Sequence, residues 1–128
     1  IGSRRAPGRD GTVPQPFYRV FFGRVHSWLC HQFLVPHIQD FTCGFKLFKG
    51  AVADDLFSVA RINGYGLDLE LLYIAQRRGY KIAEVPINWA DQPGSKVWVL
   101  KDGLCMLREL LAVRHNAAKG LYARRATE

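Results

Sequence analysis

The feature that most constrains this chain is an apolar segment held between two prolines. Twelve of the nineteen residues of 17–35 are apolar, and Pro16 and Pro36 bracket them. Proline is tolerated at a helix start and stops a helix at its end, so the segment predicts one long helix. Its length is close to that of a membrane span, but two arginines and two histidines are too many ionisable groups for one. We expect a helix packed against protein, with one face at a membrane interface.

The rest of the chain predicts further helices and short strands. Apolar residues at helical spacing predict helices over 50–59, 68–78 and 98–114, and Gly79 lies where the second of these ends. Alternating residues predict short strands over 44–48 and 81–89, and residues 1–4 resemble the end of a buried strand. The segment 98–114 is amphipathic, and we expect one broad apolar face from Val99, Leu100, Leu104, Met106, Leu107, Leu110, Leu111 and Val113.

The net charge of +7 is concentrated at the two ends of the chain. Residues 1–24 hold five arginines and one aspartate, residues 25–100 are neutral, and residues 101–128 hold six basic and three acidic residues. Basic ends suggest an anionic partner, either a phosphorylated ligand or a membrane surface, although plain solubilising charge accounts for them equally well. Nucleic acid is disfavoured because there is no recognisable binding motif and no continuous basic stripe.

Cysteine and histidine usage argues against a metal or disulfide framework. The three cysteines have no C-x-x-C spacing, and the four histidines show no ligand spacing, so we interpret them as surface or core residues. An odd number of cysteines fits a reducing compartment.

Four short motifs carry polar residues that could act on a ligand. They are the strand-end tripeptide 2–4, the acidic, glycine-containing connection 40–46, the two-carboxylate segment 64–70, and the Gly-Ser-Lys loop 94–96. Each also has a structural interpretation: a strand exit, a capped turn, acids favoured by a helix dipole, and a solvated loop. Asp68 and Glu70 are two residues apart, so they cannot share one helix face.

The order of these motifs along the chain resembles the C-terminal half of family-2 glycosyltransferases that act on polyprenyl phosphates. The dolichyl-phosphate glucosyltransferase group is the most similar and the mannosyltransferase branch is close behind. The resemblance covers residues 1–115, with a basic tail over 116–128. It implies the α/β fold class and the C-terminal portion of an incomplete GT-A domain, a Rossmann-like fold that binds a nucleotide sugar at the ends of parallel strands.

The resemblance also implies an activity and a place for it. Such enzymes transfer a hexose, here glucose by preference, from a nucleotide sugar of the UDP-glucose or GDP-mannose type to dolichyl or polyprenyl phosphate with inversion. They use Mg²⁺ or Mn²⁺ and act peripherally at the cytoplasmic face of a membrane. A mannosyltransferase-like enzyme and a non-catalytic membrane-surface or scaffold fragment remain the alternatives.

Carried over by motif, the resemblance assigns roles to named residues. Asp40 matches an acidic residue close to the reaction centre and is the expected catalytic carboxylate. The expected phosphate-binding residues are Arg4, Arg19, Arg24, Ser95 and Lys96, and the expected pocket residues are Cys43, Gly44, Phe45, Asp68 and Glu70.

The chain departs from the family pattern in one respect that matters for activity. The uracil-binding strand and the Asp-x-Asp metal motif of the family are not found before residue 10. We therefore expect the metal ligands in a preceding half, no metal site in this chain, and a partial domain that is inactive by itself.

Overall fold

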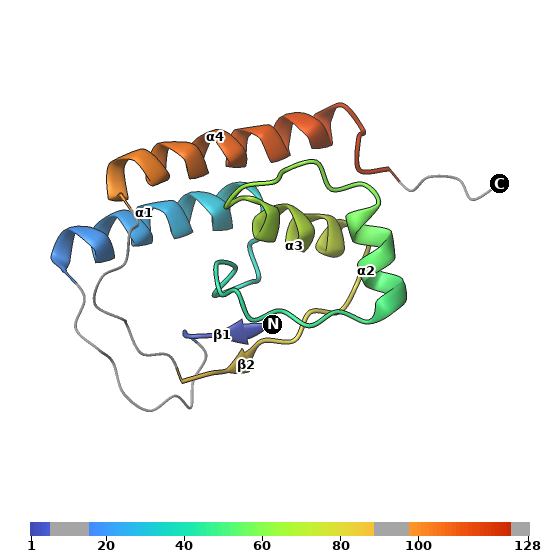
Figure 1. Ribbon diagram of the computed structural model, residues 1–128, viewed down its shortest axis with the longest axis horizontal. Coiled ribbons are helices and arrows are strands. Elements are labelled where there is room, and N and C mark those ends of the chain that lie inside the picture. The colour runs from blue at the N-terminus through green and yellow to red at the C-terminus, as the bar shows by residue number, and fades with distance from the viewer. Residues whose placement is uncertain (6–15, 89–97, 124–128) are drawn as a thin grey trace.

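The computed structural model describes residues 1–5, 16–88 and 98–123 (Figure 1). It contains four helices and two short strands within these ranges. In chain order they are β1 (Gly2–Ser3), α1 (Phe17–Phe33), α2 (Gly50–Phe57), α3 (Leu67–Arg77), β2 (Val85–Pro86) and α4 (Val99–Ala118).

The elements form a helical layer above a small sheet. In Figure 1, α1 and α4 lie side by side along the top and run in the same direction, and α3 lies beneath them. Helix α2 packs against α3, and the two strands lie at the bottom of the view. The structure is therefore a mixed fold of helices with few strands. This agrees with the expected α/β class at the level of helices and strands together.

The two strands are parallel, with Gly2 opposite Val85 and Ser3 opposite Pro86. The Val85 amide donates to the Ile1 carbonyl at 2.8 Å, and the Ile87 amide donates to the Ser3 carbonyl at 3.1 Å. Pro86 has no amide proton to donate, which is tolerated because it lies at a non-donating position of this short ladder. The strands predicted at 1–4 and 81–89 are present, each over two residues only.

The predicted strand over 44–48 is wrong. This segment is extended beside β1 and accepts one backbone bond, from the Gly2 amide to the Phe45 carbonyl at 2.8 Å. The Lys46 side chain instead turns inward and donates to the carbonyls of Phe41 and Cys43. The alternation of the sequence therefore reflects an anchored loop and not a paired strand.

The hydrophobic core lies where α3 meets α1, α2 and α4. Its buried apolar side chains come mostly from the end of α1, the whole inner side of α3 and the second half of α4; the largest are Leu56, Leu72, Ile74, Val35 and Val113. Only Ser27 and Cys30 of α1 are buried, so the first half of α1 extends beyond the core.

The predicted helices are all confirmed, and Gly79 follows α3 with a φ of 74°, the left-handed conformation that glycine adopts most easily. The broad apolar face expected for 98–114 is not fully covered. Leu110 and Val113 are buried, whereas a row of four leucines points outward: Leu100, Leu104, Leu107 and Leu111. Helix α4 continues past residue 115 to Ala118, and Tyr122 beyond it contacts α3.

Candidate functional site

The centre of the candidate site is an ion pair between Arg4 and Asp40. Arg4 Nε donates to Asp40 Oδ2 at 2.7 Å, and Nη2 donates to Oδ1 at 2.8 Å. The Arg4 backbone amide also donates to Oδ2 at 2.8 Å. The guanidinium fork fits a carboxylate in this two-point manner, which fixes both groups in orientation. Two residues expected in the site from their motifs are thus brought together.

The ion pair favours the charged form of both partners. Burial raises the pKa of Asp40, but the hydrogen bonds and the charge of Arg4 outweigh burial and hold this pKa below its usual value. The hydrogen bond to Asp40 raises the pKa of Arg4 in turn. The Asp40 side chain is only 2% exposed, so its carboxylate does not face solvent. Its two oxygens hold the Arg4 guanidinium in place.

Neighbouring residues hold the loop around this ion pair. Thr42 Oγ1 accepts from Arg4 Nη2 at 2.8 Å. The Glu84 carboxylate accepts from the backbone amides of Gln39 at 2.7 Å and Asp40 at 3.3 Å. Arg5 donates to Ser27 Oγ of α1 at 2.6 Å. The end of β1, the 39–42 loop and α1 are therefore tied together.

A second ion pair joins the motif of residues 40–46 to that of residues 64–70. Lys46 Nζ lies 3.2 Å from Asp68 Oδ2, and its side chain is only 5% exposed. The same amine donates to the Phe41 carbonyl at 3.1 Å. Lys46 therefore fixes the 41–43 loop relative to the first turn of α3.

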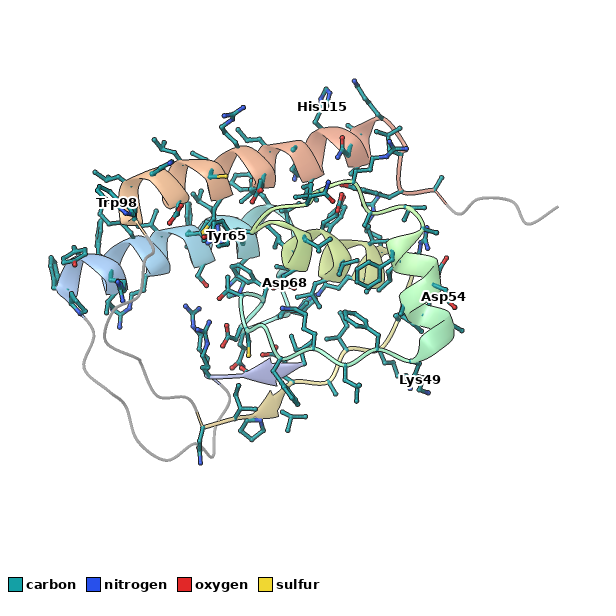
Figure 2. The ribbon with its side chains drawn as sticks, viewed as in Figure 1. Lys49, Asp54, Tyr65, Asp68, Trp98 and His115 are labelled. Atoms are coloured by element: carbon teal, nitrogen blue, oxygen red, sulfur yellow. The ribbon has the colours of Figure 1, made fainter. Side chains whose placement is uncertain are left out.

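A cavity of about 520 Å³ opens beside these two ion pairs. It is lined by α1, the 41–42 loop, the 63–66 loop, the start of α3 and α4, through His26, Phe41, Thr42, Asn63, Gly64, Tyr65, Gly66, Leu67, Asp68, Leu69 and Met106. Figure 2 labels Asp68 at the start of α3 and Tyr65 in the loop before it. Thr42 is the link between this cavity and the first ion pair, because it both lines the cavity and binds Arg4.

His26 places an imidazole in the wall of this cavity. Its ring centroid lies 5.8 Å from that of Phe41, and burial lowers its pKa from the usual value. The ring is therefore neutral near pH 7 and can exchange hydrogen bonds without adding charge. The sequence pattern predicts surface or core positions for all four histidines and does not single out His26.

Glu70 lies outside the cavity and braces the fold. It is fully buried, and Oε2 accepts from the amides of Arg61 at 2.9 Å and Ile62 at 3.0 Å. Tyr122 donates its hydroxyl to Oε1 at 2.6 Å. Asp68 faces the cavity and Glu70 faces the core, as their two-residue spacing predicted.

Among the other expected site residues, Cys43 contacts the second ion pair through its carbonyl, which accepts from Lys46 Nζ, and none of the described ones lines the cavity. Cys43 is buried, whereas Gly44 and Phe45 are exposed beside β1. Arg19 is half-buried and Arg24 exposed on α1, and neither lines the cavity. Ser95 and Lys96 lie outside the described residues.

Besides His26, three residues with contacts at the site were not expected there: Thr42, Lys46 and Glu84. Thr42 and Lys46 stand inside the motif of residues 40–46, so their position was a usable signal. Glu84 lies 44 residues from Asp40, and nothing in the local pattern pointed to that contact.

The described residues do not form a metal centre. Within 1–5, 16–88 and 98–123, no three His, Cys, Asp or Glu side chains gather closely enough to hold a metal ion. A divalent ion at this site would need ligands from elsewhere.

Comparisons with known proteins place the chain among glycosyltransferases. It is 33% identical over 126 residues to dolichyl-phosphate beta-glucosyltransferase of Mus musculus, covering 98% of this chain and 39% of that protein. The Drosophila melanogaster protein of the same name is 33% identical over 113 residues, covering 88% and 35%. Glycosyltransferase AglD of Haloferax volcanii is 33% identical over 110 residues, covering 86% and 17%.

The match is thus nearly complete for this chain and partial for its relatives. The chain spans between 35% and 39% of the length of the mouse and fly proteins. No family model matches the chain, and no solved structure matches it significantly. By its similarity to these curated proteins over most of its length, the chain is a relative of the dolichyl-phosphate beta-glucosyltransferases and fits a family-2 glycosyltransferase.

Proposed function

We propose that this chain is part of a GT-A glycosyltransferase that transfers glucose from a nucleotide sugar to dolichyl phosphate. Relatives named dolichyl-phosphate beta-glucosyltransferase support both the reaction and the preference for glucose over mannose. The parallel pairing of β1 with β2, with Arg4 directly after β1, is compatible with a ligand site at the carboxyl ends of a larger parallel sheet.

The observation that carries the proposal is the immobilised Arg4, which binds Thr42 in the cavity wall. The substrates bring two anionic groups together, the diphosphate of the donor and the phosphate of the lipid. A guanidinium held by a buried carboxylate is oriented before an anion arrives, so little reorganisation is needed when charge develops.

In the proposed reaction a phosphate oxygen of dolichyl phosphate attacks the anomeric carbon of glucose. The bond from that carbon to the nucleoside diphosphate breaks, the diphosphate keeps the electron pair, and the configuration inverts. The acceptor is already an anion, so no strong general base is required. We assign Arg4 to binding phosphate and Asp40 to positioning Arg4, since both oxygens of Asp40 are engaged in this contact.

A Mg²⁺ or Mn²⁺ ion remains part of the proposal for the complete enzyme and would stabilise the leaving diphosphate. The described residues offer no ligand set for it. We therefore assign its ligands to residues outside those described, and the roles given to Arg4 and Asp40 do not depend on it.

The proposed place of action is the cytoplasmic face of a membrane, with peripheral attachment. The surface of α1 carries exposed aromatic and aliphatic residues, namely Phe17, Tyr18, Phe21, Phe22, Val25 and Trp28. The surface of α4 carries the four outward leucines. Apolar side chains beside basic ones, such as Arg24 and Arg108, suit the interface of an anionic bilayer. Among the described helices, none combines the length and apolarity that crossing a membrane requires.

The test is a transfer assay on the complete gene product that contains this chain. Vesicles with dolichyl phosphate are incubated with radiolabelled UDP-glucose or GDP-mannose, and lipid-linked sugar is extracted. We expect glucose transfer, reduced at least 100-fold by Arg4→Ala and unchanged by Arg61→Ala, which removes an exposed arginine outside the site. Absence of glucose transfer, or full activity of Arg4→Ala, would overturn the proposal.

A further inference from the structure

The loop before α3 is held by a side chain from α4. Helix α3 begins after Gly66, which has no side chain to cap the free amides of the first turn. Glu109 of α4 holds the residue before the helix instead, because the amide of Gly66 itself donates to Glu109 Oε2 at 2.6 Å. A carboxylate at this position is also favoured by the positive end of the α3 dipole.

The two glycines of this loop fit closely against Glu109. A Cβ atom on Gly66 would lie 2.7 Å from Glu109 Cβ, which is closer than real Cβ contacts allow. A Cβ atom on Gly64 would overlap the Glu109 carboxylate, which is the movable end of that side chain. Glycine at 64 and 66 is therefore explained by the close approach of Glu109.

This contact lies directly behind the wall of the candidate cavity. Gly64, Tyr65 and Gly66 all line the cavity, and so does Met106, one helical turn before Glu109 on α4. Asp68, in the first turn of α3, faces the same cavity and is held by Lys46 from the other side. The position of this wall is thus set from both sides, by Lys46 and by Glu109.

We infer that Glu109 is a positioning residue that fixes the 64–66 loop as a wall of the substrate cavity. It acts through the Gly66 amide and does not itself line the cavity. The claim that the cavity receives substrate rests on the proposed function. The claim that Glu109 sets the loop stands on the contacts alone.

Amide hydrogen exchange of this chain tests the contact without any assay of activity. In Glu109→Ala we expect the Gly66 amide to exchange at least tenfold faster, because its acceptor is gone, and in Glu109→Gln less so, because an amide oxygen remains. Arg108→Ala, the exposed neighbour on α4, is the matched control and leaves the Gly66 amide unchanged.

A glycine substitution gives a second, independent arm. Gly64→Ala pushes the Glu109 carboxylate away from Gly66, so it raises Gly66 exchange by itself. Combined with Glu109→Ala, it adds nothing further, because the group that it displaces is absent. Unchanged exchange at Gly66 in Glu109→Ala, or fully additive effects in the double variant, would overturn the inference.

Kinetics of the complete enzyme then test the consequence for substrate. We expect Glu109→Ala to raise KM for dolichyl phosphate about tenfold with little change in kcat, and Glu109→Gln to restore most of this loss. Equal KM values for wild type and Glu109→Ala would contradict a positioning role. If the wild-type enzyme transfers no sugar, the proposed function fails while the exchange result still decides the role of Glu109.

Discussion

Arg4 and Asp40 are 36 residues apart in sequence and form a two-point ion pair, with a third bond from the Arg4 backbone amide to the same carboxylate. A buried carboxylate loses its hydration, and this loss is offset only when donors of good geometry replace the water. Asp40 has such donors on both oxygens, since Thr42 Oγ1 also lies 3.3 Å from Oδ1. The end of β1 is therefore held to the 39–42 loop by charge as well as by backbone bonds.

The first prediction concerns the loss of this carboxylate. Asp40→Asn leaves the Arg4 guanidinium beside a neutral amide, so we expect the free energy of unfolding at pH 7 to fall by about 3 kcal/mol. Asp54→Asn, which changes an exposed aspartate of α2 (Figure 2), is the control and changes it by less than about 0.5 kcal/mol. Urea unfolding followed by circular dichroism measures both.

The pH dependence of this difference has a definite sign. The pKa of Asp40 is lower in the folded state than in the unfolded chain, so its contribution is present above the unfolded value, about 3.9. It is lost as the pH falls below that value towards the folded pKa. Wild type and Asp40→Asn should therefore converge in stability below about pH 4, and a constant difference down to pH 2.5 would contradict the ion pair.

The second prediction concerns Lys46, whose amine serves two loops at once. Lys46→Met removes the donor to the carbonyls of Phe41 and Cys43 and the partner of Asp68. Because the carbonyls lose their donor in a buried setting, we expect a loss of about 2 kcal/mol in unfolding free energy. Lys49→Met, an exposed lysine three residues on, is the control and should behave like wild type in thermal unfolding.

The third prediction concerns the attachment of the segment after α4. Tyr122 donates to the buried Glu70 carboxylate, and burial together with this bond raises the pKa of its hydroxyl. Tyr122→Phe removes that donor, so we expect a loss of about 2 kcal/mol and faster amide exchange at residues 120–122. Tyr18→Phe, on the exposed part of α1, should change neither quantity.

The helices could be predicted because each carries local signals. The prolines around 17–35, the apolar spacing of 68–78 and Gly79 at its end are patterns within one element, and local patterns dictate helices. Arg4 and Asp40 were expected in one site because their motifs matched a known family. They are 36 residues apart, and no local sequence pattern predicts contact over that separation.

The strand over 44–48 was mispredicted because alternation does not show what a strand pairs with. The Lys46 amine holds the 41–43 loop through the carbonyls of Phe41 and Cys43. The alternation of apolar and polar residues cannot predict such a tertiary contact. Likewise, the hydrophobic face of α4 was correctly found but not divided into its buried and exposed parts. Leu110 faces the core and Leu111 faces outward, a division set by the neighbouring helix α1.

The fourth prediction uses the three cysteines as probes of packing. Cys105 is exposed on α4, whereas Cys30 and Cys43 are buried, and burial raises the pKa of the Cys30 thiol to about 12. Thiolates react and thiols do not, so one thiol per chain should react quickly with Ellman's reagent at pH 8. Three fast thiols in the folded protein would contradict the core described above, and Cys105→Ser should abolish the fast phase.

The last prediction concerns the outward leucines of α4, which are placed to enter a bilayer interface. Leu104 and Leu111 are 65% and 59% exposed, so replacing both with serine leaves the core intact. If each leucine is half buried in lipid, the pair contributes about 2 kcal/mol, and the double variant should bind vesicles about 30-fold more weakly.

Sedimentation with vesicles of phosphatidylcholine and phosphatidylserine measures this affinity. The control is Leu47→Ser, since Leu47 is 87% exposed but lies in the loop before α2, away from α4. Loss of binding in the α4 variant alone would place that helix at the membrane, because Leu47→Ser also removes a highly exposed leucine. Equal binding of both variants and wild type would assign the exposed leucines a different partner, and with it the membrane-facing role proposed for α4 would fall.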